Sequence, residues 1–525
     1  MRLAAIRLVA TLVAVAAPAG AQEAFDVLIR GGRVFDGSGN PWVRADVGLR
    51  GDRIAAVGEL SRATASRVID AGELYVAPGF IDTHTHAGPG LATAALSPAL
   101  PLLAQGVTTA FVNPDGGGPV DLAAQRTGLL RHGLGVNVAQ LVPHGSVREA
   151  VLGMQDRLAN AEELGRMQEL VRRGMAEGAF GLSSGPFYAP GSYSDTAELI
   201  ALARVAAQAG GAYQSHVRDE SSYTIGVLAA VDEVIAVARG ARLPSVVTHV
   251  KALGQDVWGF STAIALRIQA ARDEGLEVWA DQYPYEASAT GLAPALLPRW
   301  AQAGGAEALR SRLRDAGTRS RIRAEAARNL ERRGGASRIR FRRLPADPAF
   351  AGRTLGDLAR AKGQQPVDVA LELLETGSPG IVSFAMFESD VRSLMRQPWT
   401  LTASDGELVP FGEGVPHPRG YGTFARKLRR YALDEGVVGL EQALRSMTSL
   451  PAAVYRIEDR GVLRPGAYAD LVVFDPARVR DRATYAEPHQ LAEGMLHVFV
   501  NGRPALRDGA PTEERAGRVL RRDAP

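Results

Sequence analysis

The sequence predicts an α/β protein: a (β/α)8 TIM-type barrel with a small β-sandwich domain formed from both chain ends. Through the middle of the chain, eight short apolar segments alternate with helix-like stretches, as strands buried on both faces do. Both chain ends instead alternate apolar and polar residues between Gly-Gly, Asp-Gly and Asn-Gly turns. The length of 525 residues is enough for one large barrel and an appended domain.

The N-terminus has the features of a secretory signal peptide over residues 1–21. Two arginines precede an apolar run at residues 8–17, and Ala19-Gly20-Ala21 provides an A-x-A cleavage site. The run is too short to cross a bilayer as a helix, so we expect no stable membrane insertion. The sequence therefore predicts an exported protein, periplasmic or secreted, whose mature chain begins near Gln22.

The β-domain is expected to combine residues 22–77 with residues 456–525. Short strands broken by glycine-containing turns fill residues 26–60. The same texture returns at residues 461–476 and 495–509, where strands surround Gly and Asn-Gly turns. Because the two ends resemble each other and differ from the middle, we expect them to pair in one domain.

The barrel is predicted over residues 78–455, with one large insertion. Its expected strands are 79–84, 107–113, 136–142, 179–183, 211–217, 245–250, 276–282 and 399–404. More than 110 residues separate the last two strands, which is too long for one crossover helix. We therefore expect an insertion at about 290–345 that covers the mouth of the barrel.

Composition excludes several classes of protein. Hydrophobic residues make up 46% and charged residues 22% of the chain, which excludes disorder. The absence of cysteine excludes disulfides, thiol nucleophiles and thiolate metal ligands. The net charge is only +3, which argues against a nucleic-acid partner. The dense group of 13 arginines at residues 310–343 is interpreted as a solvated helix face, with an anionic partner as the alternative.

Histidine and aspartate side chains stand at the carboxyl ends of several predicted strands. His84 and His86 end the first strand, and their i, i+2 spacing directs both imidazoles to one side. His216, His249 and Asp405 end the fifth, sixth and eighth strands. The carboxyl ends of barrel strands converge on one mouth, so these five residues are expected to form a divalent-metal site, with zinc the first choice.

A series of motifs resembles one known family. In chain order they are PGFIDTHTH, GVTTAFVNPDGG, GAFGLSSGPFYAPGSYSDT, SHVRDE, THVKALG, ADQYPYEASATGL, ASDG, HPRGYGTFARKL and SMTSLPAAVYRIEDRG. Together they resemble the N-acyl-D-amino-acid deacylase (D-aminoacylase) family of the amidohydrolase superfamily. The runs GAYADLVVFDP and VFVNGRP resemble the closing β-domain of that superfamily, so the resemblance covers nearly everything after residue 25.

The resemblance implies a ligand set for one or two Zn²⁺ ions. His84, His86 and Asp405 resemble the ligands of one metal position, and His216 and His249 resemble those of the other. The family usually completes the second position with a cysteine, and the matching residue in this chain is Asp115. A carboxylate is a harder ligand than a thiolate and can bridge two ions or bind one. Whether one or two metals bind, and whether Asp115 is only a turn residue, are open at this point.

The chemistry of such a site is amide hydrolysis by an activated water. A divalent cation lowers the pKa of a water that it binds towards about 7 and polarises a carbonyl. Asp405, beside that water, is expected to accept its proton and to pass it to the departing amine. The implied reaction converts an N-acyl-D-amino acid into a D-amino acid and a carboxylate. A preference for the D form is implied by the resemblance alone.

Five residues are candidates for binding the substrate. The carboxylate of an N-acyl amino acid calls for Lys, Arg or Tyr donors. Lys251 lies two residues after His249, so strand alternation points both side chains the same way. The Lys251 side chain could hold the carboxylate, or it could be carboxylated and bridge two metal ions. Arg419 and Tyr283 resemble family contacts to the carboxylate, whereas Tyr188 and Ser288 are further candidates, and packing is an equal alternative for Tyr188. The five are Lys251, Tyr283, Arg419, Tyr188 and Ser288.

Other functions and roles stay open from the sequence alone. A dipeptidase or a cyclic-amide hydrolase on the same barrel is the alternative activity, and a binding protein on a decayed barrel is the non-enzymatic one. A serine hydrolase is disfavoured because no G-x-S-x-G motif occurs. His144 is interpreted as support for the site rather than as a ligand, and Arg218 and Glu220 could orient His216. The acyl-chain preference and the oligomeric state are not predicted.

Overall fold

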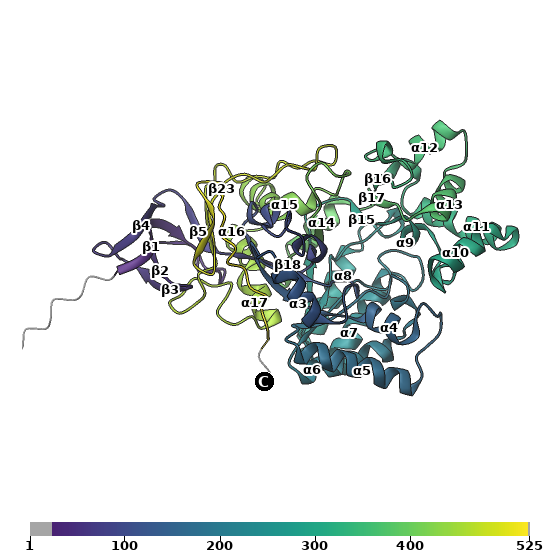
Figure 1. Ribbon diagram of the computed structural model, residues 1–525, viewed down its shortest axis with the longest axis horizontal. Helices are drawn as coiled ribbons and strands as arrows, with labels where there is room; N and C mark the ends of the chain where they lie inside the picture. Colours follow the sequence, from purple (N-terminus) through teal and green to yellow (C-terminus); the bar gives the residue numbers. More distant parts are fainter. Residues whose placement is uncertain (1–23, 523–525) are drawn as a thin grey trace, which may run out of the picture.

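The computed structural model describes residues 24–522, and Figure 1 shows three regions side by side. A β-domain lies at one end, the barrel lies in the middle, and the insertion forms the opposite end. The predicted signal peptide, residues 1–21, lies outside the described residues. Among residues 24–522, no helix is long and apolar enough to span a membrane.

The β-domain is one nine-stranded sheet made from both ends of the chain. From edge to edge its strands are β23 (Ala510–Pro511), β22 (Arg503–Arg507), β21 (Met495–Val500), β20 (Leu471–Phe474), β5 (Tyr75–Pro78), β1 (Ala24–Val34), β2 (Val43–Arg50) and β3 (Arg53–Gly58), and β4 (Thr64–Asp70) pairs with β1. The antiparallel pairing of β5 with β20 joins the two chain ends. The final residues depart from the predicted boundary of 456–525, because Val519 bridges Val138 on a barrel strand.

Strand alternation gives this sheet two buried faces. In β20, Leu471 and Val473 belong to the core of the β-domain, whereas Val472 and Phe474 pack against the barrel. Residues of β2, β3, β20 and β21 share the first of these cores, so the single sheet curls until its distant strands face each other. One face of the sheet therefore forms the core of the β-domain, and the other face packs against the barrel.

All eight predicted barrel strands are present, and the predicted fold class is confirmed. The strands are β6 (Phe80–Asp82), β8 (Val107–Val112), β9 with β10 (Asn137–Gln140 and Val142–Pro143), β11 (Gly181–Ser184), β12 (Ala212–Ser215), β13 (Ser245–Val247), β14 (Val278–Gln282) and β18 (Thr400–Thr402). Neighbours pair in parallel. The ring closes where the Asp405 amide donates to the His84 carbonyl over 2.8 Å and where β19 (Gly406–Glu407) pairs with β7 (Thr85–His86).

Helices surround the barrel and cover its outer surface (Figure 1). They are α1 (Gly88–Leu91), α2 (Leu100–Leu103), α3 (Leu122–Leu130), α4 (His144–Leu152), α5 (Ala161–Ala176), α6 (Thr196–Gln208), α7 (Val227–Ala241), α8 (Ser261–Asp273), α14 (Glu388–Met395), α15 (Arg419–Arg426), the π-helix η6 (Lys427–Asp434), α16 (Leu440–Met447) and α17 (Ser449–Tyr455). The α5 helix shows how the sequence specifies them. Asn160 and Glu163 form a capping box at its start, and Met167, Val171 and Met175 recur at helical spacing on its buried side.

The insertion is larger than the sequence predicted. It contains β15 (Ser288–Gly291), α9 (Leu292–Leu296), α10 (Gly305–Arg314), α11 (Ala316–Arg332), β16 (Ile339–Arg343), α12 (Leu355–Lys362), α13 (Pro366–Thr376) and β17 (Gly380–Ser383). The expected range of about 290–345 ended too early, because β17 is the central strand that pairs with both β15 and β16. The insertion has its own apolar core, which includes Leu296, Ile322, Phe341 and Leu371.

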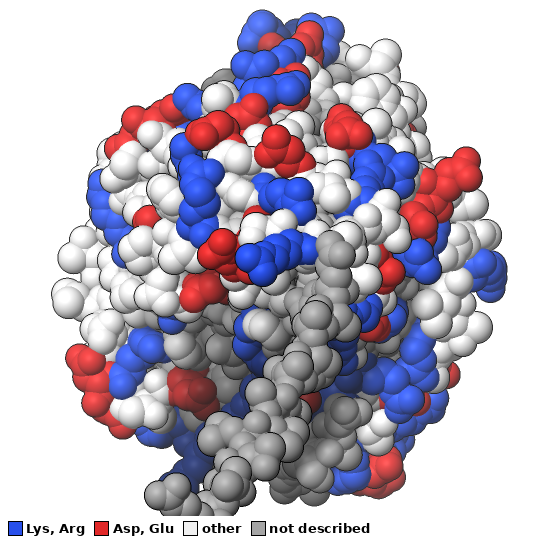
Figure 2. All heavy atoms as spheres, turned by 90° about the vertical axis from the view of Figure 1, so that its left-hand side faces the viewer, with Lys and Arg blue, Asp and Glu red and all other residues white. Residues whose placement is uncertain are grey.

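Several arginines on the helices α10 and α11 of the insertion are paired with acidic or aromatic side chains. Arg319 pairs with Glu375, Arg323 with Asp368 over 2.6 Å, and the Arg321 guanidinium lies 4.1 Å from the Trp300 ring centroid. These contacts fit the interpretation of a solvated helix face. Figure 2 faces the opposite, β-domain end of the molecule, where basic and acidic side chains are interspersed.

Candidate metal centre and active-site pocket

The six candidate ligands all follow barrel strands at their carboxyl ends. His84 and His86 follow β6, Asp115 follows β8, and the others follow β12, β13 and β18. Three of them, Asp115, His249 and Asp405, adopt left-handed backbone conformations with φ of 56°, 36° and 50°. Non-glycine residues pay a conformational cost there, which is typical of functional sites where the backbone is bent to direct a side chain.

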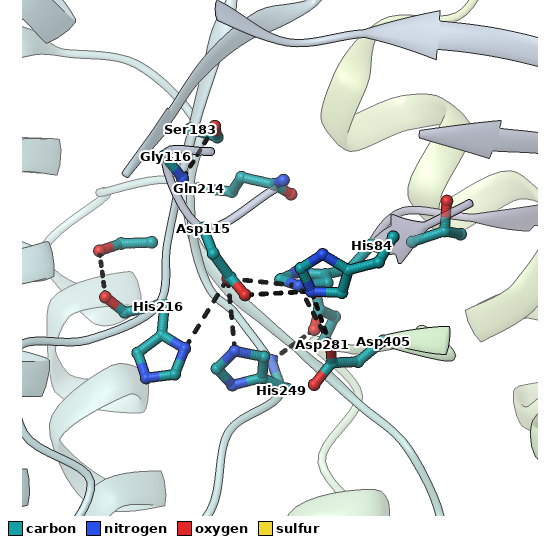
Figure 3. Close-up of polar contacts among 12 residues, drawn as sticks. His84, Asp115, Gly116, Ser183, Gln214, His216, His249, Asp281 and Asp405 are labelled. Carbon is teal, nitrogen blue, oxygen red and sulfur yellow. Dashed lines mark hydrogen bonds and ion pairs between the residues drawn. The ribbon is translucent and has the colours of Figure 1, made fainter. Parts of the chain in front are cut away.

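Asp115 connects two groups of potential metal ligands (Figure 3). Asp115 Oδ1 lies 3.3 Å from His84 Nε2, and Asp115 Oδ2 lies 3.3 Å from His86 Nε2. Asp405 completes this first group, with Oδ1 at 3.2 Å from His86 Nε2. The second group consists of Asp115 Oδ1, His216 Nδ1 at 3.8 Å and His249 Nε2 at 3.5 Å. The structure thus brings all six together, with Asp115 shared.

The donor atoms of these groups fit a divalent cation. Both ring nitrogens of His84 and of His216, together with Asp115 Oδ1, are buried and have no hydrogen-bond partner among the described residues. Buried polar atoms are normally paired, and three of these five lie close together, since Asp115 Oδ1 is near both His84 Nε2 and His216 Nδ1. Their lack of hydrogen bonds indicates a missing ligand. Imidazole nitrogen and carboxylate oxygen suit Zn²⁺ and other first-row divalent ions. The positions therefore fit one or two cations.

The raised pKa values of two histidines among these ligands also indicate a site for positive charge. The Asp115 and Asp405 carboxylates, 3.3 Å and 3.2 Å from His86 Nε2, raise the pKa of His86 to about 10. Burial opposes charge on His249, yet the nearby carboxylates of Asp115 at 3.5 Å and Glu220 at 3.3 Å raise its pKa to about 9. The three carboxylates of Asp115, Asp405 and Glu220 thus favour positive charge on these two imidazoles. A divalent cation supplies the same compensating charge to neutral imidazoles.

Two further carboxylates hold the ligand loops and were missed by the sequence analysis. Asp82 accepts from the Ser404 amide over 2.9 Å, and burial raises the pKa of Asp82 to about 7. Asp281, at the end of β14, accepts from the His249 amide over 2.5 Å. Asp281 lies one residue before the carboxyl end of β14, within the quoted motif ADQYPY, so its position near a strand end could have marked it.

Glycine allows the Asp115 loop to approach β11 closely. A Cβ atom on Gly185 would lie 2.2 Å from the Asp115 carbonyl oxygen, a distance no side chain tolerates. Ser183 Oγ donates to the Asn113 carbonyl over 2.5 Å and accepts from the Gly116 amide over 3.3 Å. The turn that carries Asp115 is therefore fixed by the neighbouring strand.

We call the six candidate metal ligands the ligand cluster. All five candidate substrate residues line one cavity of about 920 Å³ that also contains residues of this cluster. Arg419, at the start of α15, places Nη1 2.7 Å from Asp405 Oδ2. Its guanidinium also lies 4.7 Å from the ring centroid of Tyr283. Arg419 Nη1 has no hydrogen bond of good geometry, so it retains donor capacity beside the ligand cluster. Arg419 and Tyr283 together form a cationic and aromatic wall.

Lys251 is tied to the ligand cluster as well as to the cavity. Its ammonium contacts the Glu220 carboxylate and lies 2.7 Å from His249 Nδ1. Glu220 also lies 3.7 Å from His216 Nε2, so one carboxylate faces both histidines of the second group. Pairing with a carboxylate favours an ammonium at Lys251 over a carboxylated side chain.

The remaining predicted residues occupy distinct places. The Tyr188 ring lies 4.7 Å from the His216 ring, and the Tyr188 hydroxyl lies 3.3 Å from Thr290 Oγ1. Ser288 Oγ is buried and has no partner among the described residues. His144 is apart from the ligand cluster and pairs with Glu198 over 2.9 Å. Arg218 pairs with Glu233 over 2.8 Å rather than with His216.

Comparisons with known proteins identify relatives along nearly the full chain. The amidohydrolase family profile matches residues 67–506. The D-aminoacylase of Alcaligenes xylosoxydans xylosoxydans is 36% identical over 527 aligned residues, which cover 96% of this chain and 99% of that protein.

Two solved structures are similar over their whole length. N-acyl-D-glutamate deacylase from Bordetella bronchiseptica, complexed with zinc and a phosphonate that mimics the tetrahedral intermediate, has a TM-score of 0.80 and 35% identity. A D-aminoacylase with a binuclear metal center, described by one-metal activation and second-metal attenuation, has a TM-score of 0.81 and 34% identity. Both comparisons cover 95% of this chain and 100% of the other. The chain therefore belongs to the amidohydrolase family, in its D-aminoacylase branch.

Proposed function

We propose that this protein is a zinc-dependent amidohydrolase that cleaves the amide bond of N-acyl-D-amino acids. The observation that carries the proposal is the pair of ligand groups sharing Asp115 in a cavity whose wall contains Arg419. The metal-ligand groups supply a hydrolytic centre, and the guanidinium supplies a partner for a carboxylate. The D-aminoacylase and N-acyl-D-glutamate deacylase relatives support the substrate class.

His84, His86 and Asp405 would hold one zinc ion, His216 and His249 would hold a second, and Asp115 would contribute to both. The separate contacts of its two oxygens support this double role, since Oδ2 faces His86 and Oδ1 faces the other imidazoles. When bound, the metal supplies Lewis acidity that polarises the scissile carbonyl and acidifies the attacking water.

Asp405 is the proposed general base and acid. Its carboxylate takes a proton from the attacking water and delivers that proton to the amine nitrogen as the C–N bond breaks. Arg419, 2.7 Å from Asp405 Oδ2, holds the carboxylate in position and keeps it ionised. Although burial opposes ionisation, the Arg419 charge and a hydrogen bond from His86 lower the pKa of Asp405.

The cavity wall would orient the substrate through its free carboxylate. Arg419 and the Tyr283 hydroxyl are the proposed donors to that carboxylate, with Lys251 beside them. The Ser288 hydroxyl has unused hydrogen-bonding capacity toward the substrate. Tyr188, against His216, would pack on the acyl or side-chain atoms.

An activity assay tests this proposal. The purified protein is loaded with zinc and assayed for amine release from matched N-acetyl-D- and N-acetyl-L-amino acids, with and without chelator. Chelator-sensitive release from the D series is expected. Failure to hydrolyse either series with zinc bound would overturn the proposal and direct the search to dipeptides and cyclic amides.

We also propose that the protein is exported. The support is the signal-like segment at residues 1–21, with its basic start, apolar run and A-x-A site. Mass spectrometry of the protein from fractionated cells should find a chain that begins at Gln22 outside the cytoplasm. An uncleaved chain in the cytoplasm would contradict export.

A further inference from the structure

The cavity has a second cationic wall, supplied by the insertion. Arg333 directly follows helix α11, lines the same cavity as the ligand cluster, and is 2% exposed. Its Nε donates to the Ala295 carbonyl over 3.4 Å, and its Nη1 is buried without a hydrogen-bond partner among residues 24–522. Burying a charged donor without a partner is destabilising, so a ligand is the natural completion of this site.

No carboxylate of the described chain neutralises this wall. Within residues 24–522, Arg333 and the neighbouring Arg299 form no ion pair with any Asp or Glu. The nearby Asp219 is already occupied by its own loop. Its oxygens accept backbone N–H groups of Ser221 over 2.8 Å and of Thr224 over 2.6 Å.

The position of Arg333 relative to the ligand cluster follows from a chain of aromatic contacts. Its guanidinium lies 5.7 Å from the Tyr223 ring, which lies 5.8 Å from the Phe187 ring. The Phe187 ring in turn lies 5.0 Å from His216. Arg333 is therefore on the side of the second ligand group, whereas Arg419 pairs with Asp405 in the first.

We propose that Arg333 binds a second carboxylate of the substrate, distinct from the one assigned to Arg419. This inference rests on the proposed function and narrows its substrate class to N-acyl-D-amino acids that carry an additional acid. That acid stands either on the amino-acid side chain or at the end of the acyl group. In either position the second carboxylate lies away from the scissile amide. The Arg333 guanidinium can bind it there through charge-assisted, bidentate hydrogen bonds.

The alternative role of Arg333 is to cap the C-terminus of α11, where cations interact favourably with the helix dipole. The contacts do not fit that role, since its donor reaches Ala295 rather than the last carbonyls of α11. The preceding Arg332 behaves as a structural residue. It donates to Asn329 Oδ1 over 2.6 Å and to Ser222 Oγ over 3.1 Å, and it does not line the cavity.

Arg333→Gln is the test variant, and Arg332→Gln is its matched control. Both are compared with the wild-type holoenzyme on two substrate pairs that differ only in charge. One pair is N-acetyl-D-glutamate and N-acetyl-D-glutamine, and the other is N-succinyl-D-leucine and its terminal amide. We expect wild type to prefer the acid of one pair by about tenfold or more in kcat/KM, as a charge-assisted bond provides. Arg333→Gln should lose that preference, while Arg332→Gln should keep it.

The pair that responds identifies the source of the carboxylate. Loss of preference in the glutamate pair assigns Arg333 to the side chain, and loss in the succinyl pair assigns it to the acyl group. The proposal is overturned if wild type treats acid and amide alike, or if Arg333→Gln leaves both preferences intact. It is also overturned if the variant merely lowers Tm, since removal of an unpaired charge should maintain or raise it.

The experiment separates failure of this inference from failure of the proposed function. If no N-acyl-D-amino acid is hydrolysed, the proposed function fails. Thermal shift with the same four compounds then carries the comparison, because binding needs no turnover. A larger shift with the acids that disappears in Arg333→Gln supports the second carboxylate site, and equal shifts contradict it.

Discussion

Two buried polar clusters in this protein are assembled alike but are satisfied very differently. The ligand cluster joins residues from distant strand ends and leaves several of its buried nitrogen and oxygen atoms without partners. The second cluster, which we call the interface cluster, consists of Asn137, Arg460, Asp470 and Asn501 where the barrel meets the β-domain. None of its side-chain nitrogen or oxygen atoms is among the unpaired atoms of the described residues.

The interface cluster is a closed network. Asp470 pairs with Arg460 and accepts from the Asn501 amide over 2.7 Å and from Asn137 Nδ2 over 3.1 Å. Asn501 Oδ1 accepts from Arg460 Nη2 over 2.9 Å, and Asn501 Nδ2 donates to Asn137 Oδ1 over 2.8 Å. Because each donor has an acceptor, this network fixes the β-domain on the barrel and offers nothing to a ligand.

The comparison teaches that unpaired buried atoms, rather than buried charge itself, distinguish the working site from the structural one. A fold that leaves imidazoles and a guanidinium unpaired is less stable than one that pairs them, and a ligand offsets that cost. The left-handed backbone at Asp115, His249 and Asp405 adds to the same cost. Substitutions in the two clusters should therefore have opposite effects on activity and stability.

The largest expected effect is the loss of activity in Asp405→Asn. The amide retains the shape of the side chain but cannot carry the proton, so kcat should fall by about 10³-fold or more, equivalent to about 4 kcal/mol. The substitution also removes the carboxylate partner of Arg419, and bound zinc is expected to offset the lost stability, so kcat is compared per folded, zinc-bound molecule. The measurement is kcat together with zinc content and Tm. A near-normal kcat with zinc bound would remove Asp405 from the role of general base.

Asp470→Asn should give the opposite result. Loss of the carboxylate leaves Arg460 as a buried unpaired charge, which costs about 3 kcal/mol or more in the free energy of unfolding. Activity per folded molecule should stay within about twofold at low temperature, since the interface cluster makes no contact with the ligand cluster. Tm and the specific activity of the soluble fraction test this. A selective loss of kcat at unchanged Tm would erase the distinction between the clusters.

The sequence predicted the ligand cluster better than the interface cluster, for a physical reason. A metal site needs particular side chains, and barrel topology brings the carboxyl ends of all strands to one mouth, so His84, His216 and Asp405 could be grouped from the sequence alone. Asn137 and Asn501 carry no chemistry that a pattern can single out. Their partnership depends on how the β-domain docks, which strand spacing does not specify.

Several contacts at the cavity could not be predicted from the sequence, because they also depend on how separate parts of the chain pack together. Glu220 was proposed to orient His216, but its contact with Lys251 depends on the depth of two loops. Arg333 looked like one of many arginines on a solvated helix, because its burial depends on how the insertion folds back. The insertion itself was cut short, since β17 is recognisable as its central strand only through its pairing with β15 and β16.

A smaller effect is expected at the cavity wall. Arg419→Ala and Lys251→Ala remove cations from the proposed carboxylate site, so each should mainly raise KM, by about 10- to 100-fold. Arg419→Ala should also lower kcat, because Arg419 lies 2.7 Å from Asp405 Oδ2 and holds that carboxylate. Steady-state kinetics on one N-acetyl-D-amino acid separates the two constants. An unchanged KM in both variants would place the substrate carboxylate elsewhere.

The buried side chain of Lys427 is only partly satisfied, so it falls between the two clusters in this respect. It is 3% exposed and lies at the start of the π-helix η6. Its ammonium donates to Thr402 Oγ1 over 2.8 Å and to Ser446 Oγ over 2.9 Å, but no carboxylate within the described residues pairs with it. Its hydrogen bonds are therefore made while its charge is not compensated. Burial accordingly lowers the pKa of Lys427 to about 7.

The smallest predicted effect is a change in how stability depends on pH. Between about pH 7 and 10, unfolded Lys427 binds a proton that the folded form releases, so its contribution to the unfolding free energy rises with pH; below pH 7 it is constant. Lys427→Met should lose this slope, about 1 kcal/mol per pH unit, and gain most over wild type near pH 7. Comparing the two proteins by denaturant unfolding at pH 7, 8 and 9 cancels the titration of the histidines. A difference that stays constant across this range would show that the two hydroxyls keep Lys427 charged, and hydrogen bonding alone would then suffice to satisfy a buried charge.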